Sequence, residues 1–211
     1  MRGILIGSGQ YIPLDLLRME IDRGGYLVAI DGGSNYLYEI GRLPDLLIGD
    51  QDSIDGGVLD WIRSNEVEEL KFPSEKDSTD MELGIDYLHK KGCRELVIFG
   101  GTGTRLDHSL ANIFLLDRID SLGMEGQIID RNNRIFLVDG SMKIPRGLGE
   151  FVSLIPLTRS GAVVDLEGFK YPLDGYFMRF NTSIGISNEI SDEYGLVRVK
   201  SGSVLVFISK D

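Results

Sequence analysis

The stretch 46–53, with the sequence LLIGDQDS, joins a short apolar run to two carboxylates that follow it within one turn. Such apolar runs are typical of buried parallel strands, and a glycine followed by an acid is typical of a strand's end. Asp50 and Asp52 would repel each other there unless a cation or a proton lay between them. Carboxylate oxygens suit Mg²⁺, which binds phosphates through one or two carboxylates. With the further acids Asp77 and Asp80, the stretch predicts a magnesium-phosphate site.

Composition limits the classes of partner. The chain has 211 residues and a net charge of −11 at pH 7. Nucleic acid and anionic membranes need a basic footprint and are not expected as partners. Cys93 is the single cysteine, which excludes an intrachain disulfide and a cysteine-based zinc cluster. Neither a signal-peptide pattern nor an apolar run of membrane-spanning length is present, so we expect a cytoplasmic protein.

Similar apolar runs recur at 4–6, 26–30, 67–72 and 96–99. Most of them end in glycine, an acid or both, and the intervening segments are long enough for the crossover helices that parallel strands require. Open parallel sheets bind ligands in the crevice outside the carboxyl ends of their strands. Glycine and aspartate also serve in tight turns and helix caps, and that structural role is sufficient for Gly7-Ser8-Gly9 alone.

Two helices are expected from the periodicity. The first covers 79–91, where Thr79 and Glu82 form a capping box and Asp80 lies in the first turn, beside the strand ends. The second covers 107–122 and is apolar nearly all round at 113–116, so we expect it to be well buried.

The loop 100–108, GGTGTRLDH, leads into the second helix. Its backbone N–H groups and the helix N-terminus are suited to phosphate, and Arg105 would add charge-assisted contacts. It is not a Walker A loop, because the G-K-[ST] ending is absent. Asp107 is interpreted as the helix N-cap, as a site residue or as both, and His108 as a positioned neighbour.

After Gly123 only short strand-like runs remain, at 127–129, 134–138, 151–157, 162–166 and 176–180. The last pair, 196–200 and 204–208, flanks Ser-Gly-Ser and predicts a hairpin. The chain is therefore expected to form an α/β domain over 1–123 and an all-β domain over 124–211.

One alternative is a nicotinamide-linked oxidoreductase. Gly7-x-Gly9 followed by Asp31 at the end of the next strand is similar to a dinucleotide fingerprint. The third glycine is missing, because position 12 is Ile12, and the later carboxylates would have no role. We rank this reading below metal-phosphate chemistry.

Taken together, these loops resemble those of thiamine pyrophosphokinases, over essentially the whole chain. The matching stretches are 31–37 (DGGSNYL), 44–45 with 49–53 (PD, GDQDS), 76–82 (KDSTDME), 100–108 with Asn112, and 181–189 (NTSIGISNE). The resemblance implies transfer of the diphosphoryl group of ATP to the hydroxyl of thiamine, giving thiamine diphosphate and AMP with Mg²⁺ as cofactor. It also implies a Rossmann-like nucleotide-binding domain, a smaller thiamine-binding β-sandwich, and a homodimer with thiamine at the subunit interface.

The resemblance also assigns roles by position. The implied ligands of the metal are Asp31, Asp50, Asp52 and Asp80, and the implied catalytic residues are Asp50, Asp52, Asp80, Arg105 and Asp107. The implied ATP-binding residues are Asp31, Gly32, Asn35, Lys76, Asp77, Thr79, Gly101, Thr102, Arg105, His108 and Asn112. Thiamine would contact Gln51, Ser183, Ser187 and Asn188.

Gln51 departs from the family pattern, in which the residue between the two acids is usually apolar. The departure favours a third hypothesis, a non-catalytic thiamine or nucleotide sensor, since a fold alone does not establish function. The full set of carboxylates argues against a sensor, because a binding protein has no need of four acids around one phosphate site.

Overall fold

The computed structural model describes residues 1–10, 12–71 and 77–211, and it divides into two compact units, Met1–Arg131 and Asn132–Asp211. The run 127–129, expected in the β half, is instead the last strand of the first unit. It pairs in parallel with the strand that contains Phe99. No helix in these described ranges is long and apolar enough to cross a membrane.

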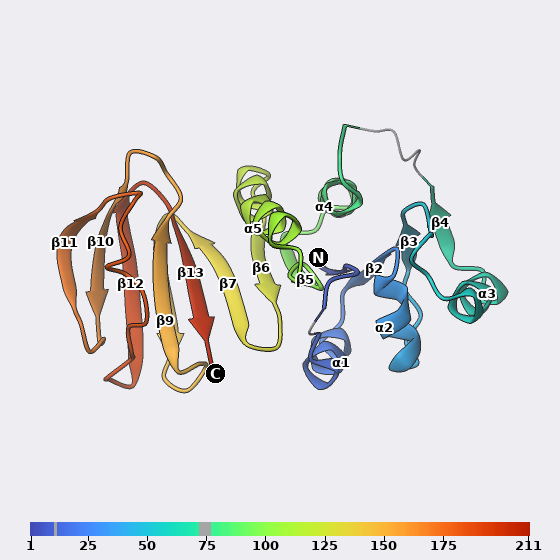
Figure 1. The fold of residues 1–211 in the computed structure, drawn as a ribbon, viewed down its shortest axis with the longest axis horizontal. Helices are drawn as coiled ribbons and strands as arrows, with labels where there is room; N and C mark the ends of the chain where they lie inside the picture. The colour runs from blue at the N-terminus through green and yellow to red at the C-terminus, as the bar shows by residue number, and fades with distance from the viewer. Residues whose placement is uncertain (11, 72–76) are drawn as a thin grey trace. The chain divides into compact units, whose positions relative to one another are not determined.

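The first unit alternates strands and helices along the chain (Figure 1). Its elements are β1 (Arg2–Ile6), α1 (Leu14–Asp22), β2 (Tyr26–Ile30), α2 (Gly33–Glu39), β3 (Leu46–Ile48), α3 (Gly56–Ser64), β4 (Glu68–Leu70), α4 (Asp80–Lys90), β5 (Glu95–Phe99), α5 (Leu106–Ser121) and β6 (Glu125–Ile129). The strands pair in parallel in the order β4-β3-β2-β1-β5-β6. The order reverses between β1 and β5, as in doubly wound folds, which confirms the expected fold class.

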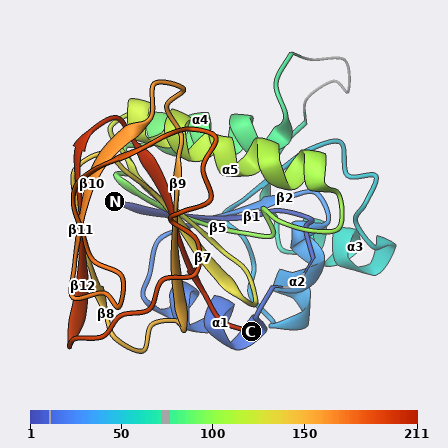
Figure 2. The ribbon, with the colours of Figure 1, turned by 60° about the vertical axis from the view of Figure 1, so that its left-hand side comes forward.

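Helices cover both faces of this sheet, which explains why its strands are continuous apolar runs. Figures 1 and 2 show α4 and α5 on one side of the sheet and α1 and α2 on the other. Leu17 of α1 and Leu37 of α2 pack with Ile4 and Ile6 in one core cluster. On the opposite face α4 lies so close that a Cβ at Gly84 would come within 2.7 Å of Leu5 Cδ1.

Helix α5 forms where expected but is not well buried. Leu106, Leu110 and Phe114 are 80%, 53% and 49% exposed, while Leu116 and Ile119 are buried. Residues 116 and 119 lie one turn apart and define the face that packs on the sheet. Phe114 lies off that face and is exposed, so within the apolar run 113–116 only Leu116 is fully buried.

The second unit contains two antiparallel sheets, β7-β13-β9 and β11-β10-β12-β8, around one apolar core. Its strands are β7 (Asn133–Val138), β8 (Ser141–Pro145), β9 (Phe151–Pro156), β10 (Ala162–Glu167), β11 (Leu173–Met178), β12 (Tyr194–Ser201) and β13 (Val204–Ser209). The predicted terminal hairpin is wrong, because β12 and β13 lie in different sheets. Gly202, with φ +77°, carries the chain from one sheet to the other.

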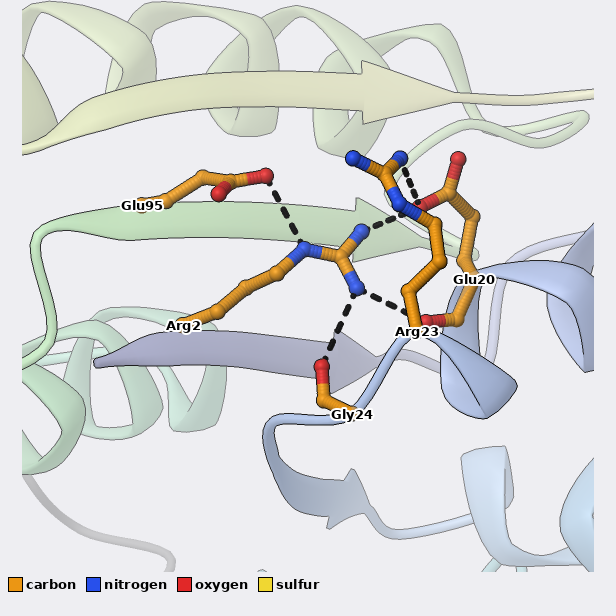
Figure 3. A network of polar contacts seen from close by, with 5 residues as sticks. All are labelled: Arg2, Glu20, Arg23, Gly24 and Glu95. Carbon is orange, nitrogen blue, oxygen red and sulfur yellow. Dashed lines mark hydrogen bonds and ion pairs between the residues drawn. The ribbon is translucent and has the colours of Figure 1, made fainter.

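A buried polar network ties β1 to its neighbours at the amino end of the sheet (Figure 3). Arg2 Nη2 donates to the carboxylate of Glu20 on α1, and Arg2 Nε donates to Glu95 Oε1 of β5 over 2.9 Å. Arg23 also donates to Glu20 over 2.9 Å. Glu20 is only 4% exposed, so its charge depends on these partners.

We predict that Arg2→Met lowers the free energy of unfolding by about 3 kcal/mol, because it leaves the buried Glu20 carboxylate short of its main partner. Urea denaturation provides the measurement. Arg18→Met is the matched control, since Arg18 forms an exposed pair with Asp15, and exposed pairs contribute about 0–1 kcal/mol. Equal losses in the two variants would contradict the role assigned to the network.

Candidate active site

The loops that follow β1, β2 and β5 meet at the point where the strand order reverses. A cavity of about 860 Å³ opens there. The cavity is lined by the β1 loop, Asp31, the start of α4, the glycine-rich β5 loop and the first turns of α5. This is the place where open parallel sheets bind ligands.

The β1 and β5 loops are packed backbone against backbone. A Cβ at Gly9 would lie 2.3 Å from Gly100 O, and one at Gly100 would lie 2.2 Å from Gly7 O. Gly9 N donates to Gly100 O over 2.9 Å. The glycine pair that suggested a nicotinamide fingerprint is therefore required by the contact between two loops of the sheet.

Asp31 is held at the end of β2 in a constrained position. Its φ is +43°, and its carboxylate packs against Gly49, where a Cβ would lie 1.7 Å from Oδ1. Gln51 N donates to the same oxygen over 3.0 Å. Non-glycine residues at positive φ are costly and concentrate at functional sites.

The pKa of Asp31 is raised to about 6, mainly by burial and further by the charges of Asp80, Asp50 and Asp52, while the N–H of Gln51 opposes the rise. Three of the four acids expected to bind metal therefore act on the carboxylate of the fourth. Asp31 and Asp80 line the cavity, whereas Asp50 and Asp52 lie outside its lining.

A preassembled metal cage is not present: across residues 1–10, 12–71 and 77–211 no group of three or more acidic, histidine or cysteine side chains is arranged to hold an ion. Mg²⁺ does not require such a group, because it usually keeps several waters and is held by one or two carboxylates together with substrate phosphates.

The side chain of Gln51 is held by two residues that the sequence did not single out. Its Nε2 donates to Glu69 Oε2 of β4 over 2.5 Å, and Arg63 of α3 donates to its Oε1 over 3.1 Å. Gln51 has φ +72°. These bonds attach the turn that carries Asp50 and Asp52 to two neighbouring elements.

The glycine-rich loop is fixed by side chains of α5. Ser109 Oγ accepts from Gly103 N over 3.0 Å, and Asn112 Nδ2 donates to Gly101 O over 2.8 Å. Thr102 Oγ1 donates to Asp130 Oδ2 over 2.9 Å. Ser109 and Asp130 were missed, because a serine inside a helix and an acid after a strand carry no specific signal of this role.

Arg105 and Asp107 form an exposed ion pair, with Nη2 to Oδ2 at 2.6 Å. Their mutual hydrogen bond raises the pKa of Arg105 and lowers that of Asp107. The interpretation of Asp107 as N-cap is wrong: α5 begins at Leu106 and its N-cap is Arg105, which makes no side-chain capping bond. His108 lines the cavity, with Nε2 4.0 Å from Asp107 Oδ2.

The other residues expected near ATP divide into two groups. Asp77, Thr79, Gly101 and Thr102 line the cavity, and Thr79 also forms the expected capping box with Glu82. Gly32 and Asn35 do not line it. Asn35 instead accepts from Asp55 N and donates to Ser53 O. Lys76 lies outside the described residues.

In the second unit, the segment expected to contact thiamine is a loop after β11. Ser183 is exposed, and Ser187 has φ +57° and donates its N–H to Ser153 Oγ over 2.9 Å. Asn188 is 6% exposed, and its amide both accepts from Tyr171 N and donates to Tyr171 O. Asn188 thus fixes the loop that presents Ser187.

We predict that Asp31→Asn stabilises the metal-free protein at neutral pH. In the wild type, the folded carboxyl binds its proton up to about pH 6, whereas its ordinary pKa is 3.8. The contribution of Asp31 to stability therefore falls as pH rises between these values and is level above them. The advantage of the variant in urea denaturation should grow across this window. An advantage that does not change with pH, or one shared by the exposed control Asp60→Asn, would contradict this.

We predict that Gln51→Leu, which introduces an apolar residue typical of the family, lowers the free energy of unfolding by about 1–2 kcal/mol. The loss follows from two broken side-chain hydrogen bonds at a partly buried carboxylate. Urea denaturation measures it, and an unchanged midpoint would show that the Glu69 and Arg63 contacts contribute nothing to stability.

Comparison with known proteins agrees with this geometry. The family model "Thiamin pyrophosphokinase, catalytic domain" matches residues 17–127, and "Thiamin pyrophosphokinase, vitamin B1 binding domain" matches residues 141–205. Thiamine pyrophosphokinase of Bacillus subtilis is 30% identical over 186 residues, 87% of each chain.

Solved structures give the same result. A crystal structure of the Bacillus subtilis protein superimposes with a TM-score of 0.92 at 27% identity and covers 100% of both chains. That of the Geobacillus thermodenitrificans thiamin pyrophosphokinase gives 0.88 at 29% identity, covering 100% of this chain and 98% of the other. The chain belongs to the thiamine pyrophosphokinase family.

Proposed function

We propose that the cavity at the carboxyl edge of the parallel sheet carries the thiamine pyrophosphokinase activity of this chain, with ATP bound in it. The observation that supports this most is the position of Asp31 and Asp80 in one cavity beside a glycine-rich loop, where the charges of Asp80, Asp50 and Asp52 add to the rise in the pKa of Asp31. The hydroxyl oxygen of thiamine forms a bond to the β-phosphorus of ATP, and the bond from that phosphorus to the oxygen of the α-phosphate breaks. AMP leaves with this oxygen, and the hydroxyl proton passes to a carboxylate or water.

Positioning and charge neutralisation supply most of the catalysis in phosphoryl transfer. Asp31, Asp50, Asp52 and Asp80 would hold Mg²⁺, which when bound neutralises charge on the polyphosphate. The acids themselves would position the polyphosphate through the ion. The pKa of the half-buried Asp31 is raised to about 6, and a bound cation would favour its ionised form.

Arg105 supplies the main positive side chain of the cavity. In the structure it is paired with Asp107 at the exposed mouth. Phosphate oxygens offer a guanidinium the same planar, charge-assisted contacts as a carboxylate. A phosphate of ATP would therefore replace the carboxylate of Asp107 as the partner of Arg105. Gly101, Thr102 and Asn112 would keep the loop in place. Asp77, Thr79 and His108 would border the nucleotide.

We further propose a homodimer in which thiamine lies between the first unit of one subunit and the second unit of its partner. Ser183 and Ser187 would contact thiamine, Asn188 would fix their loop, and Gln51 would approach from the acidic turn. Exposed apolar side chains in this loop, Ile184 and Ile186, support contact with a second chain. Because ATP is the co-substrate, we propose a cytoplasmic location.

The two alternatives have lost their support. The nicotinamide reading depended on Gly7 and Gly9, which the packing of two loops explains. The sensor reading depended on Gln51, whose amide is engaged by Glu69 and Arg63. The named relatives are thiamine pyrophosphokinases.

We predict that the protein, incubated with ATP, Mg²⁺ and thiamine, yields AMP and thiamine diphosphate in equal amounts by phosphorus NMR, and that a chelator abolishes both. Asp80→Asn and Asp52→Asn should each lower kcat/KM on the order of a hundredfold, because each removes charge that the ion and polyphosphate require. Asp60→Asn, an exposed acid on α3, is the control.

Formation of ADP with thiamine monophosphate would refute transfer of a diphosphoryl group. Near-normal activity of Asp52→Asn with unchanged Mg²⁺ dependence would remove Asp52 from the site. A loss in Asp60→Asn as large as in Asp80→Asn would show that the effect is not specific to the cavity.

A further inference from the structure

The second unit contains a cavity of its own, of about 600 Å³. It lies between the connection that follows β9 and the end of β11, and we call it the arginine cavity. Its lining residues are Arg159, Ser160, Phe177, Arg179, Phe180 and Asn181. This volume is within the range of roughly 300–1,000 Å³ found for small-molecule sites. None of these residues lines the cavity of the first unit.

The charges of the arginine cavity are uncompensated. Other arginines of the second unit are engaged: Arg146 donates to Ser191 O, Arg198 pairs with Glu167, and Arg134 also has a partner. The guanidinium groups of Arg159 and Arg179 have no hydrogen bond or ion pair within residues 1–10, 12–71 and 77–211, and no carboxylate is among the lining residues. Both side chains are exposed, and they line one cavity without an acid in a chain that has 33 acids and 22 basic residues.

The cavity also offers flat apolar surface. The rings of Phe177 and Phe180 are 53% and 52% exposed although both belong to its lining. Exposed aromatic rings beside polar groups commonly mark ligand sites. Ser160 and Asn181 add hydrogen-bonding groups. A guanidinium recognises phosphate through paired N–H donors, and an aromatic ring stacks on another planar ring.

We infer that the arginine cavity is a second ligand site, which binds an organic phosphate that carries an aromatic ring. The phosphate or diphosphate would lie between Arg159 and Arg179, and the ring against Phe177 and Phe180. The choice of phosphate rests on the proposed function, because ATP, AMP and thiamine diphosphate all join such a ring to phosphate. Asn181 also lies two residues from Ser183, in the loop proposed for thiamine. A nucleotide and thiamine diphosphate both carry an aromatic ring and phosphate groups, and titration with each ligand shows which of them binds more tightly.

The test uses the full chain, without divalent ions, and follows the Nε–Hε resonances of its arginines by NMR. Inorganic pyrophosphate, ADP and thiamine diphosphate are added separately, and sodium chloride is the control for ionic strength. We expect saturable shifts of the Arg159 and Arg179 resonances, with tighter binding for ligands that have a ring than for pyrophosphate. The resonance of Arg105 reports on the first cavity in the same spectra, and the ligand that binds tighter at Arg159 identifies the source.

Arg159→Gln and Arg179→Gln should each weaken binding, read at the remaining arginine, by about tenfold, since a hydrogen bond to a charged group contributes about 1.5 kcal/mol or more. Arg198→Gln removes the same charge from the same unit outside the cavity and should change nothing. Shifts that sodium chloride reproduces, or no saturation, would overturn the inference.

Measurement of catalytic turnover tests the proposed function separately from the proposed second ligand site. The double variant Arg159→Gln, Arg179→Gln should form AMP at the wild-type rate when product is kept low. If it loses turnover, the arginines belong to the catalytic machinery and the second site does not exist. If the wild type forms no AMP while Arg159 and Arg179 still bind phosphates, the proposed function fails and the ligand site remains.

Discussion

The carboxylate of Asp31 is the constraint on which the first unit's cavity depends. It is half-buried at the end of β2 against the Cα of Gly49, and the charges of three further acids act on it. Such a position is unfavourable in isolation, because desolvation and like charges both oppose ionisation. The surrounding chain accommodates it with a glycine at φ +135° and with the N–H of Gln51. These features agree with the cation site that we propose, in which the supporting residues are held in place before the ion binds.

The sequence predicted those features that depend on interactions between residues close together in the chain. The apolar runs gave the buried parallel strands, and Thr79 with Glu82 gave the start of α4, because burial and capping act over a few neighbouring residues. The acids at the ends of β2 and β3 could be grouped because the carboxyl ends of parallel strands share one edge of a sheet. The positions of Asp80 and Arg105 near that edge followed from the two expected helices, which begin beside them.

Features that depend on distant partners could not be predicted in this way. The local sequence pattern is the same whether β12 and β13 form a hairpin or whether the turn at Gly202 leads from one sheet to the other. Only the pairing of β13 with β7 and β9 distinguishes the two arrangements. The hydrogen bond that holds the side chain of Gln51 is formed with Glu69, 18 residues away. Nothing in the sequence distinguishes Glu69 from any other acidic residue in a strand. Helix α5 buries the face that carries Leu116 and Ile119, because this face packs on the sheet. The apolar run 113–116 shows that the segment is apolar but does not predict which face is buried.

Each unit brings charged side chains of one sign together. In the first unit three carboxylates raise the pKa of Asp31, and in the second Arg159 and Arg179 line one cavity without an acid. A chain with 33 acids could have paired these arginines, as it pairs Arg198 and Lys170 on the same unit. Charged side chains without a compensating contact are expected where a ligand completes the structure. The opposite signs of the two sets agree with the different ligands that we propose: a cation with its phosphates for the carboxylates, and an anion for the guanidinium groups.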